Sequence, residues 1–348
     1  MQQQKNIRSK SKQQQDHSSF RYQLLDQTNY KHPDDCCAIS INPNNNLMIC
    51  SAYESIKVLY FKTGSLKYLQ QINKHHENIT TLNFFHRKMN FVSSSCDTSI
   101  IIWSSSLISS PKYITKLNGH SDQINSVVVA HNHQDDLIIS GSFDQTIKFW
   151  SPTCSLPSSW SCIQTIHEHT SLIYGLSINE DGNKLLSCGY DKLILVIENS
   201  NNSIWEVKQK IKVDIGLRLA FITNNIFVFQ PYQGEYLHFY TYDQLSQQYI
   251  QSKSLSIKGS GQQCQQYFPQ MFIPSKNILV SKNGQAINFI KFHFHSSGDW
   301  ECILKYVISF DKCINGLIFG TMSENGEFLV TWDQQSDQIQ IRQFQCIQ

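Results

Sequence analysis

The amino-acid sequence predicts an all-β protein made of seven repeated units of short strands. Two observations lead to this prediction. Apolar residues alternate with polar ones in short stretches between Gly- and Asn-containing turns, which is the pattern of strands with one buried face. Four consecutive units also carry the same polar and aromatic residue types about every 45 residues, which indicates an internal repeat.

The clearest unit opens with His120 and an alternating apolar run that begins at Ile124. A second strand is expected at 137–142, followed by a turn at Asp144 and a third strand that ends at Trp150. Three landmarks therefore define a unit: a His, a turn Asp, and an aromatic residue after it. The preceding unit has His75, Asp97 and Trp103. The following unit has His169 and Asp191, with Ile197 in the aromatic position. The first unit has them in eroded form, as His32, Glu54 and Tyr60.

These landmarks resemble those of the WD40-repeat family, most strongly over residues 70–197. The resemblance implies a seven-bladed β-propeller in which the Asp orients the His, the His bonds a Ser, and the Ser bonds the Trp indole. Such a tetrad is structural, because it satisfies buried polar groups within a blade. The residues expected to form tetrads are His75, Ser93, Asp97, Trp103, His120, Ser140, Asp144, Trp150, His169, Ser187 and Asp191.

The second half of the chain keeps the strand pattern but loses the tetrads. The seven units are expected to begin near residues 36, 79, 124, 173, 215, 268 and 314. The last unit ends without a fourth strand, and residues 20–25 have no unit of their own. We therefore expect residues 20–25 to complete the last blade, because an open ring would leave two unpaired sheet edges.

Two domains of unequal character are predicted: a tail at residues 1–19 and a propeller at 20–348. The tail is rich in Gln, Ser and Lys and lacks an apolar pattern, so we expect it to be disordered. Its four basic residues are a weak nuclear or anionic-surface signal, although a solvated tail is the favoured interpretation.

Composition excludes several functional classes. The 29 Lys and Arg residues nearly balance the 27 Asp and Glu residues, so no nucleic-acid partner is expected. The eleven cysteines include no Cys-x-x-Cys pair, and we expect free thiols, no metal site and no cofactor. No secretory segment or membrane-spanning run is evident, which favours a soluble protein in the cytoplasm, with the nucleus as the alternative.

Other patterns suggest chemistry but have simpler interpretations. The Ser, His and Asp of a tetrad look like a hydrolase triad, and His131 and His133 with their acidic neighbours look like a metal cluster. We interpret the first as a structural network and the second as a solvated turn. Outer strands are expected to begin near Trp160, Trp205 and Trp300, each packing an aromatic ring against its own blade. The protein is not expected to be an enzyme.

Two positions per blade are expected to form a partner-binding rim on one face of the ring: the residue before the turn Asp, and those beside the start of the first strand. Aromatic residues at such positions are typical of interfaces, although some could fold inward over the blade. The expected rim comprises Tyr53, Asn78, Cys96, Gln123, Asn125, Phe143, Tyr174 and Tyr190.

These features favour a non-enzymatic scaffold that binds other proteins or peptides, as a monomer within a larger complex. One alternative is the propeller subunit of a cytosolic iron–sulfur cluster targeting complex, which the Trp-x-Cys strand starts resemble. Others are a subunit of a ubiquitin-ligase, ciliary or chromatin complex. An enzyme with its site in the central channel would need acidic or metal-binding residues at several blades, and the expected rim is neutral.

Overall fold

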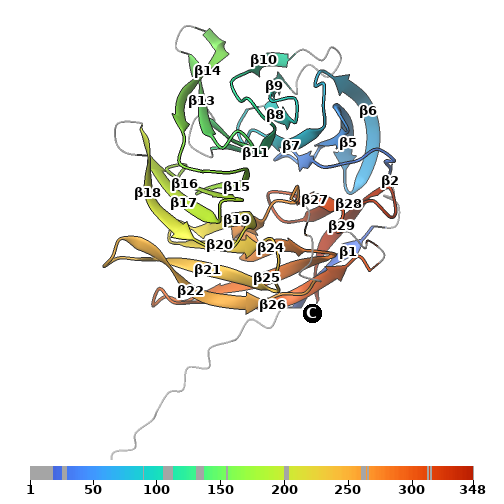
Figure 1. Cartoon of the computed structure of the whole chain (residues 1–348). Coiled ribbons are helices and arrows are strands. Elements are labelled where there is room, and N and C mark those ends of the chain that lie inside the picture. The colour runs from blue at the N-terminus through green and yellow to red at the C-terminus, as the bar shows by residue number, and fades with distance from the viewer. Residues whose placement is uncertain are drawn as a thin grey trace, which may run out of the picture.

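The computed structural model shows a closed ring of seven blades around a central axis (Figure 1). It describes residues 19–25, 30–88, 90–104, 113–130, 137–153, 156–199, 204–259, 264, 266–311, 313 and 316–347. Apart from Ser19, the predicted tail lies outside the described residues, as do His131 and His133. The prediction of an all-β, seven-bladed propeller is confirmed.

Each blade is an antiparallel sheet, and in the first six blades the strands run in sequence order from the ring axis outward. The first four blades are β3 (Ile39–Ile41), β4 (Leu47–Ala52), β5 (Ser55–Lys62) and β6 (Ser65–Asn73); β7 (Ile79–Phe84), β8 (Asn90–Ser95), β9 (Ile100–Ser104) and β10 (Tyr113–Leu117); β11 (Ile124–Val129), β12 (Ile138–Ser142), β13 (Ile147–Thr153) and β14 (Leu156–Ile166); and β15 (Ile173–Ile178), β16 (Lys184–Gly189), β17 (Leu193–Asn199) and β18 (Trp205–Lys212).

The last three blades follow the same plan. They are β19 (Gly216–Thr223), β20 (Ile226–Pro231), β21 (Tyr236–Asp243) and β22 (Gln248–Ser256); β23 (Met271–Ile273), β24 (Ile278–Asn283), β25 (Ala286–Phe294) and β26 (Trp300–Ser309), with a short 3-10 helix at Pro274–Lys276; and β27 (Ile318–Met322), β28 (Phe328–Asp333) and β29 (Gln338–Ile347). Among the described residues, no helix has the length and apolar character needed to cross a membrane.

The N-terminal segment closes the ring as predicted. Strand β1 (Ser19–Leu24) pairs antiparallel with β29 and becomes the outer strand of blade 7, and β2 (Tyr30–Lys31) pairs with the start of β29. Tyr22 anchors β1, because its ring stacks on Phe289 of blade 6 at 4.7 Å and its hydroxyl donates to the Gly326 carbonyl at 2.8 Å. Closure pairs the two sheet edges that an open ring would expose.

The apolar core lies in the wedges between neighbouring blades. Seven clusters of buried side chains are found in the described chain, and each joins two adjacent blades. One cluster joins Val58 of blade 1 to Trp103 of blade 2, and another joins Phe61 of blade 1 to Trp332 of blade 7. No blade buries its apolar faces alone, so stability depends on the completed ring.

Polar side chains add links between blades. On the outer strands, the Gln164 side chain accepts from the Trp205 N–H at 2.9 Å and donates to the Trp205 carbonyl at 2.6 Å. Gln209 bonds Tyr249 of the next blade in the same way, at 2.8 and 2.9 Å. Each glutamine side chain thus pairs one backbone N–H and one carbonyl of the neighbouring outer strand, which has no further strand beside it.

The outer tryptophans also connect neighbouring blades. Trp205 and Trp300 begin β18 and β26 as predicted, whereas β14 begins four residues before Trp160. Packing against the tryptophan's own blade is only part of the arrangement. Trp205 stacks at 5.0 Å on Phe149 of the preceding blade, and Trp300 contacts Phe239 of the preceding blade at 5.4 Å.

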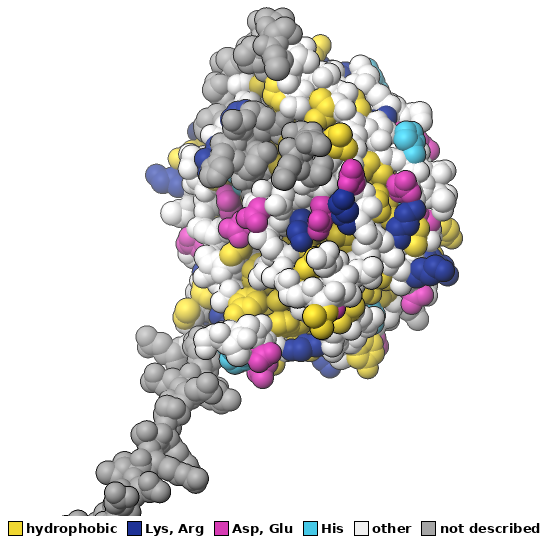
Figure 2. Space-filling view, turned by 90° about the vertical axis from the view of Figure 1, so that its left-hand side faces the viewer, with side chains coloured by type: hydrophobic (Ala, Val, Ile, Leu, Met, Phe, Trp, Pro, Cys, Tyr) yellow, Lys and Arg dark blue, Asp and Glu magenta, His cyan; other side chains and the backbone are white. Residues whose placement is uncertain are grey.

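Charges of both signs mix on the outer edge of the ring. Figure 2 shows lysine and acidic side chains side by side on the face viewed there. Lys210 pairs with Glu168 at 2.6 Å, and Lys208 pairs with Glu206. This face therefore carries no basic stripe of the kind that tracks a nucleic-acid backbone.

Candidate functional site: the polar tetrads and the partner rim

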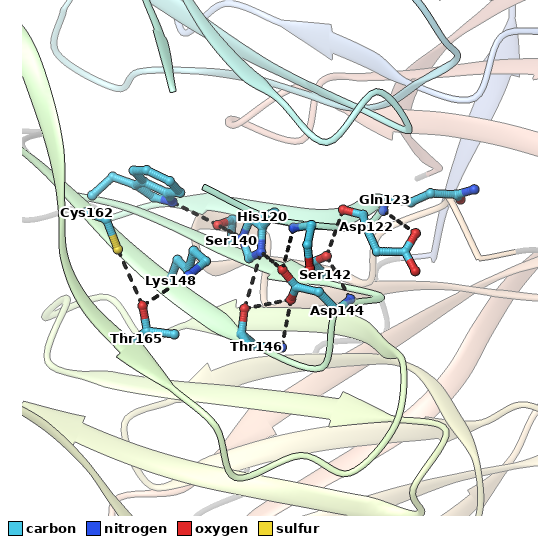
Figure 3. A network of polar contacts seen from close by, with 12 residues as sticks. His120, Asp122, Gln123, Ser140, Ser142, Asp144, Thr146, Lys148, Cys162 and Thr165 are labelled. Atoms are coloured by element: carbon cyan, nitrogen blue, oxygen red, sulfur yellow. Dashed lines mark hydrogen bonds and ion pairs between the residues drawn. The ribbon is translucent and has the colours of Figure 1, made fainter. Parts of the chain in front are cut away.

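Blades 2 and 3 contain complete tetrads. In blade 3, His120 Nδ1 lies 2.7 Å from the Asp144 carboxylate and His120 Nε2 lies 2.7 Å from Ser140 Oγ (Figure 3). The Trp150 indole donates to Ser140 Oγ at 2.9 Å. Blade 2 repeats the network with distances of 2.9 Å for His75–Asp97, 2.8 Å for His75–Ser93 and 2.9 Å for Trp103–Ser93.

The direction of these bonds explains why the serine is no nucleophile. The indole N–H can only donate, so Ser140 Oγ accepts from Trp150 and its own O–H points to His120 Nε2. The second imidazole nitrogen then donates its proton to Asp144, and every polar group in the chain is paired. Ser140 is fully buried, which leaves no room for a substrate at its hydroxyl.

The tetrad aspartates are held ionised. Burial alone would raise the pKa of Asp144, but hydrogen bonds from His120 and Thr146 outweigh it and lower that pKa below its usual range. The pKa of Asp97 is lowered in the same way by His75 and Ser99. The carboxylate also accepts the backbone N–H that follows each histidine, at 3.0 Å, and so fixes the loop that enters the blade.

Two further polar residues per blade belong to these networks and were not predicted. Thr146 donates to Asp144 at 2.6 Å, and Ser142 Oγ accepts the Asp144 N–H at 3.0 Å. Ser99 and Ser95 do the same for Asp97, at 2.5 and 3.0 Å. The signal was present in the sequence, because a Ser lies two residues before each Asp and a Ser or Thr two residues after it.

Blade 4 has a shorter network. His169 lies 2.7 Å from Asp191 and 2.8 Å from Ser187, but the indole is replaced by the fully buried Ile197. Burial alone would raise the pKa of Asp191, but the His169 contact outweighs it and lowers that pKa. The chain of bonds thus ends at the serine.

Blade 1 keeps the predicted His32, but Tyr60 does not take the predicted aromatic position. Met48 pairs with Leu59, whereas the equivalent Phe91 of blade 2 pairs with Trp103. The b–c turn of blade 1 is one residue shorter, and a one-residue slip moves a side chain to the other face of the sheet. Tyr60 therefore points outward and is 41% exposed, while the buried Leu59 takes the tryptophan position.

The two predicted rim positions of each blade lie side by side. The N–H of the residue before the turn donates to a carbonyl in the loop that enters the same blade: Cys96 to Asn78 at 2.9 Å and Phe143 to Gln123 at 2.9 Å. Tyr53 and Tyr190 make the same bond to Asp35 and Leu172, at 3.3 and 2.8 Å. The pattern continues into blade 5, where Tyr232 bonds Ile215 at 2.6 Å, so Tyr232 occupies a fifth rim position that was not predicted.

Contacts link these positions from blade to blade. Cys96 Sγ lies 3.5 Å from the Gln123 side chain of the next blade, and the Phe143 ring meets Tyr174 edge-on at 5.8 Å. The exposure of the predicted rim differs, however, from residue to residue. Tyr53, Asn78 and Tyr190 are exposed, Cys96, Gln123, Phe143 and Tyr174 are half-buried, and Asn125 is buried.

Asn125 is better described as a link between blades than as a rim residue. It is 4% exposed, and its side-chain amide donates to the Tyr174 carbonyl at 3.0 Å. The reason is its place on the innermost strand β11, which packs against the innermost strand of blade 4. Its remaining exposure is toward the central channel.

The central channel contains a cavity of about 550 Å³ lined by the innermost strands of all seven blades. Tyr267, from the loop before β23, is one of the residues that line this cavity. Its ring lies 6.2 Å from the Phe319 ring of blade 7. Burial raises the pKa of the Tyr267 hydroxyl.

Blades 5 and 6 replace the tetrad with a buried charged cluster. Arg218 Nη1 lies 3.0 Å and Lys282 Nζ 3.9 Å from Cys264 Sγ, and Lys282 also donates to the Gly316 carbonyl at 2.6 Å. Burial alone would raise the pKa of Cys264, but the two cations outweigh it and lower it; burial also lowers the pKa of Lys282 to about 8. The Cys264 sulfur is thus the acceptor that the two buried basic side chains share.

Comparison with known proteins agrees with this architecture. The family model "WD domain, G-beta repeat" matches residues 66–104, 111–151 and 160–198, which lie in blades 1–4. The chain is 38% identical over 84 residues to "Pre-mRNA-processing factor 19" of Bos taurus, and 30% identical over 83 residues to "Mitochondrial division protein 1" of Schizosaccharomyces pombe. It is 31% identical over 83 residues to the "Peroxisomal targeting signal 2 receptor" of Mus musculus.

Each of these alignments covers 24% of this chain. They cover 15%, 12% and 24% of the three relatives, so the chain matches less than a quarter of the length of each. The three repeats that the family model finds coincide with the part of the ring that carries the His, Ser and Asp networks.

Proposed function

From a seven-bladed propeller that contains WD40 repeats, we propose a non-enzymatic scaffold that holds a protein or peptide on the rim of blades 1–4. The observation that carries the proposal is the continuity of the rim. Exposed Tyr53 and Tyr190 flank half-buried Phe143 and Tyr174, and backbone bonds fix the loops that carry Tyr53, Phe143 and Tyr190. Rigid aromatic side chains lose little entropy on binding and supply much of the energy of interfaces.

A peptide-like partner is favoured over a small substrate. The serines of the Ser–His–Asp sets in blades 2–4 are buried and bonded to their histidines, so their hydroxyls are closed to a small substrate. One relative is named as a receptor for a targeting signal, which supports the recognition of a peptide by this kind of repeat. We extend the proposal to a monomer within a larger complex in the cytoplasm, without nucleic acid.

No residue of the ring favours an iron–sulfur, ubiquitin-ligase, ciliary or chromatin complex over the others. The Trp-x-Cys strand starts, which resemble the iron–sulfur targeting subunit, are explained by packing between blades. An enzyme with its site in the channel ranks below the scaffold, because the lining is mostly apolar, hydroxyl and amide side chains and its charged or imidazole residues, His86, Glu180, Arg218 and Glu324, come from four different blades. The identity of the partner therefore has to come from binding experiments.

Affinity capture from the source cell tests the proposal. We expect the Tyr53→Ala, Phe143→Ala, Tyr190→Ala triple variant to lose partners that the wild type retains, by about 30-fold or more, because truncated interface anchors cost about 2 kcal/mol each. The matched control is Tyr68→Ala, Tyr113→Ala, Ile250→Ala, which removes exposed apolar groups from outer strands. If the rim variant retains the partners and the control loses them, the binding surface lies on the outer edge.

A further inference from the structure

Blade 1 contains a cluster of metal-binding side chains where the other blades have a tetrad. Its histidine, His32, is present, but Cys50 replaces the tetrad serine and Leu59 replaces the tryptophan. A second thiol, Cys36, comes from the segment that enters the blade. His32, Cys36 and Cys50 are each 0% exposed, and their ligand atoms all lie within 4.8 Å of one another.

The thiols have weak partners in this arrangement. Cys36 Sγ lies 3.8 Å from the Ala38 carbonyl and Cys50 Sγ lies 3.9 Å from the Lys57 carbonyl, so both hydrogen bonds are long. In blade 2 the equivalent serine has two short bonds instead. The polar network that is complete in blades 2 and 3 is thus incomplete in blade 1, in a fully buried position.

The orientation of His32 fits metal binding. The Ser51 carbonyl can only accept, so His32 Nε2 carries the proton and donates to it at 2.9 Å. Nδ1 is then left with its lone pair. A metal-binding histidine commonly donates its other ring N–H to a backbone carbonyl in this way, because the bond fixes the tautomer and the ring orientation.

We propose that His32, Cys36 and Cys50 bind a thiophilic metal ion, with Zn²⁺ as the ion of choice. Two thiolates and one imidazole are a ligand set that suits zinc, at about 2.3 Å to sulfur and about 2.0 Å to nitrogen. Those lengths place ligand atoms slightly under 4 Å apart, so the side chains need to move together by about an ångström. The complete burial of all three points to a structural site.

The position of the cluster indicates what the ion would do. The His32 carbonyl accepts the Trp332 indole N–H of blade 7 at 2.8 Å, and Cys36 and Cys50 pack in the apolar cluster that joins blades 7 and 1. This is the junction between blades 7 and 1, where β1 and β2 pair with β29 and close the ring. An ion here would tie the segment before β3 to β4 and so stabilise ring closure.

Lys57 opposes the ion and provides a sharp test. Its ammonium lies 2.5 Å from the Asp34 carboxylate and 3.4 Å from His32 Nδ1, the imidazole nitrogen that carries the lone pair. A cation at this place competes with a metal ion for His32. Removing it by Lys57→Met therefore strengthens zinc binding by about tenfold or more, since the lone pair of His32 Nδ1 then faces no cation.

The test uses the full chain, purified and kept under a reductant. Elemental analysis is expected to show about one Zn²⁺ per chain. Co²⁺ added to metal-free protein is expected to give the near-ultraviolet absorption of thiolate-to-metal charge transfer. The Cys36→Ser, Cys50→Ser variant is expected to bind Zn²⁺ at least about 100-fold more weakly, while the matched control Cys37→Ser, next to the cluster but outside it, binds like the wild type.

Several results would overturn the proposal. One is metal-free wild-type protein that shows no Co²⁺–thiolate absorption, a measurement that does not depend on the folding of any variant. Another is equal zinc binding by wild type and the double serine variant. A Cys36–Cys50 disulfide that forms readily, with no metal bound under reductant, would assign the pair to redox chemistry. Weaker zinc binding by Lys57→Met would contradict the competition argument.

Discussion

Substituting one tetrad serine tests whether the polar networks stabilise the ring. Ser140 accepts from Trp150 and donates to His120, at 2.9 and 2.7 Å, and it is fully buried. Ser140→Ala leaves both partners buried without a bond, at about 1–3 kcal/mol each, so we expect a loss of about 2–6 kcal/mol in the free energy of unfolding. Ser187 bonds only His169, so Ser187→Ala is expected to cost about 1–3 kcal/mol.

The measurement is urea unfolding of the wild type and both variants, followed by tryptophan fluorescence and circular dichroism. We expect Ser140→Ala to cost about 1–3 kcal/mol more than Ser187→Ala, because the same atoms are removed and only the indole contact differs. Hydrogen exchange of β12 and β16 gives the same comparison locally if the ring unfolds in stages. Equal losses, or a larger loss for Ser187→Ala, would refute the assignment of the indole to the network.

Three further predictions concern the rest of the ring. Because Asp97, Asp144 and Asp191 have lowered pKa values, their stabilising effect is present above about pH 4 and is lost as the pH falls below it. Replacing all three by Asn should therefore weaken the dependence of the free energy of unfolding on pH in the acid range, measured by urea unfolding at several pH values. Cys264→Ala removes the sulfur that accepts from the buried Arg218 and Lys282 side chains, and because hydrogen bonds to charged groups contribute about 1.5–3 kcal/mol each, it should cost about 3–5 kcal/mol in thermal or urea unfolding. Cys188→Ala, which removes a buried thiol whose pKa burial raises to about 12, should cost about 1–2 kcal/mol. Tyr22→Ala removes the ring that anchors β1 and should destabilise closure by about 3–5 kcal/mol, seen as faster proteolysis near the N-terminus; unchanged cleavage would mean that β1 contributes little.

The fold could be predicted from local signals because each unit repeats them. Alternation and turn residues located all seven blades, even those without tetrads, since strand pairing needs only one apolar face. The closing strand could be predicted because residues 20–25 had no unit of their own, and the structure pairs Ser19–Leu24 with β29. Counting residues from the turn position Glu54, in contrast, misplaced Tyr60, because a turn shorter by one residue reverses the faces of the strand.

The site was less accessible to sequence reasoning because it depends on contacts between units. Asn125 occupies a position expected at the rim, but the neighbouring innermost strand buries it. Tyr232 was missed because blade 5 has no turn Asp to mark the position. The two cysteines and the histidine of blade 1 match no spacing motif, and the fold alone brings them together.

Photo-crosslinking tests the central claim, that partners bind the rim of blades 1–4. A photoreactive residue would replace Tyr190 on the rim or Ile163 on the outer strand β14; the two side chains are 52% and 53% exposed, so their access to solvent is matched. In source-cell extract, we expect discrete crosslinked proteins from position 190 and only background from position 163. Crosslinks of the same proteins from position 163, with none from position 190, would contradict the rim as the partner site.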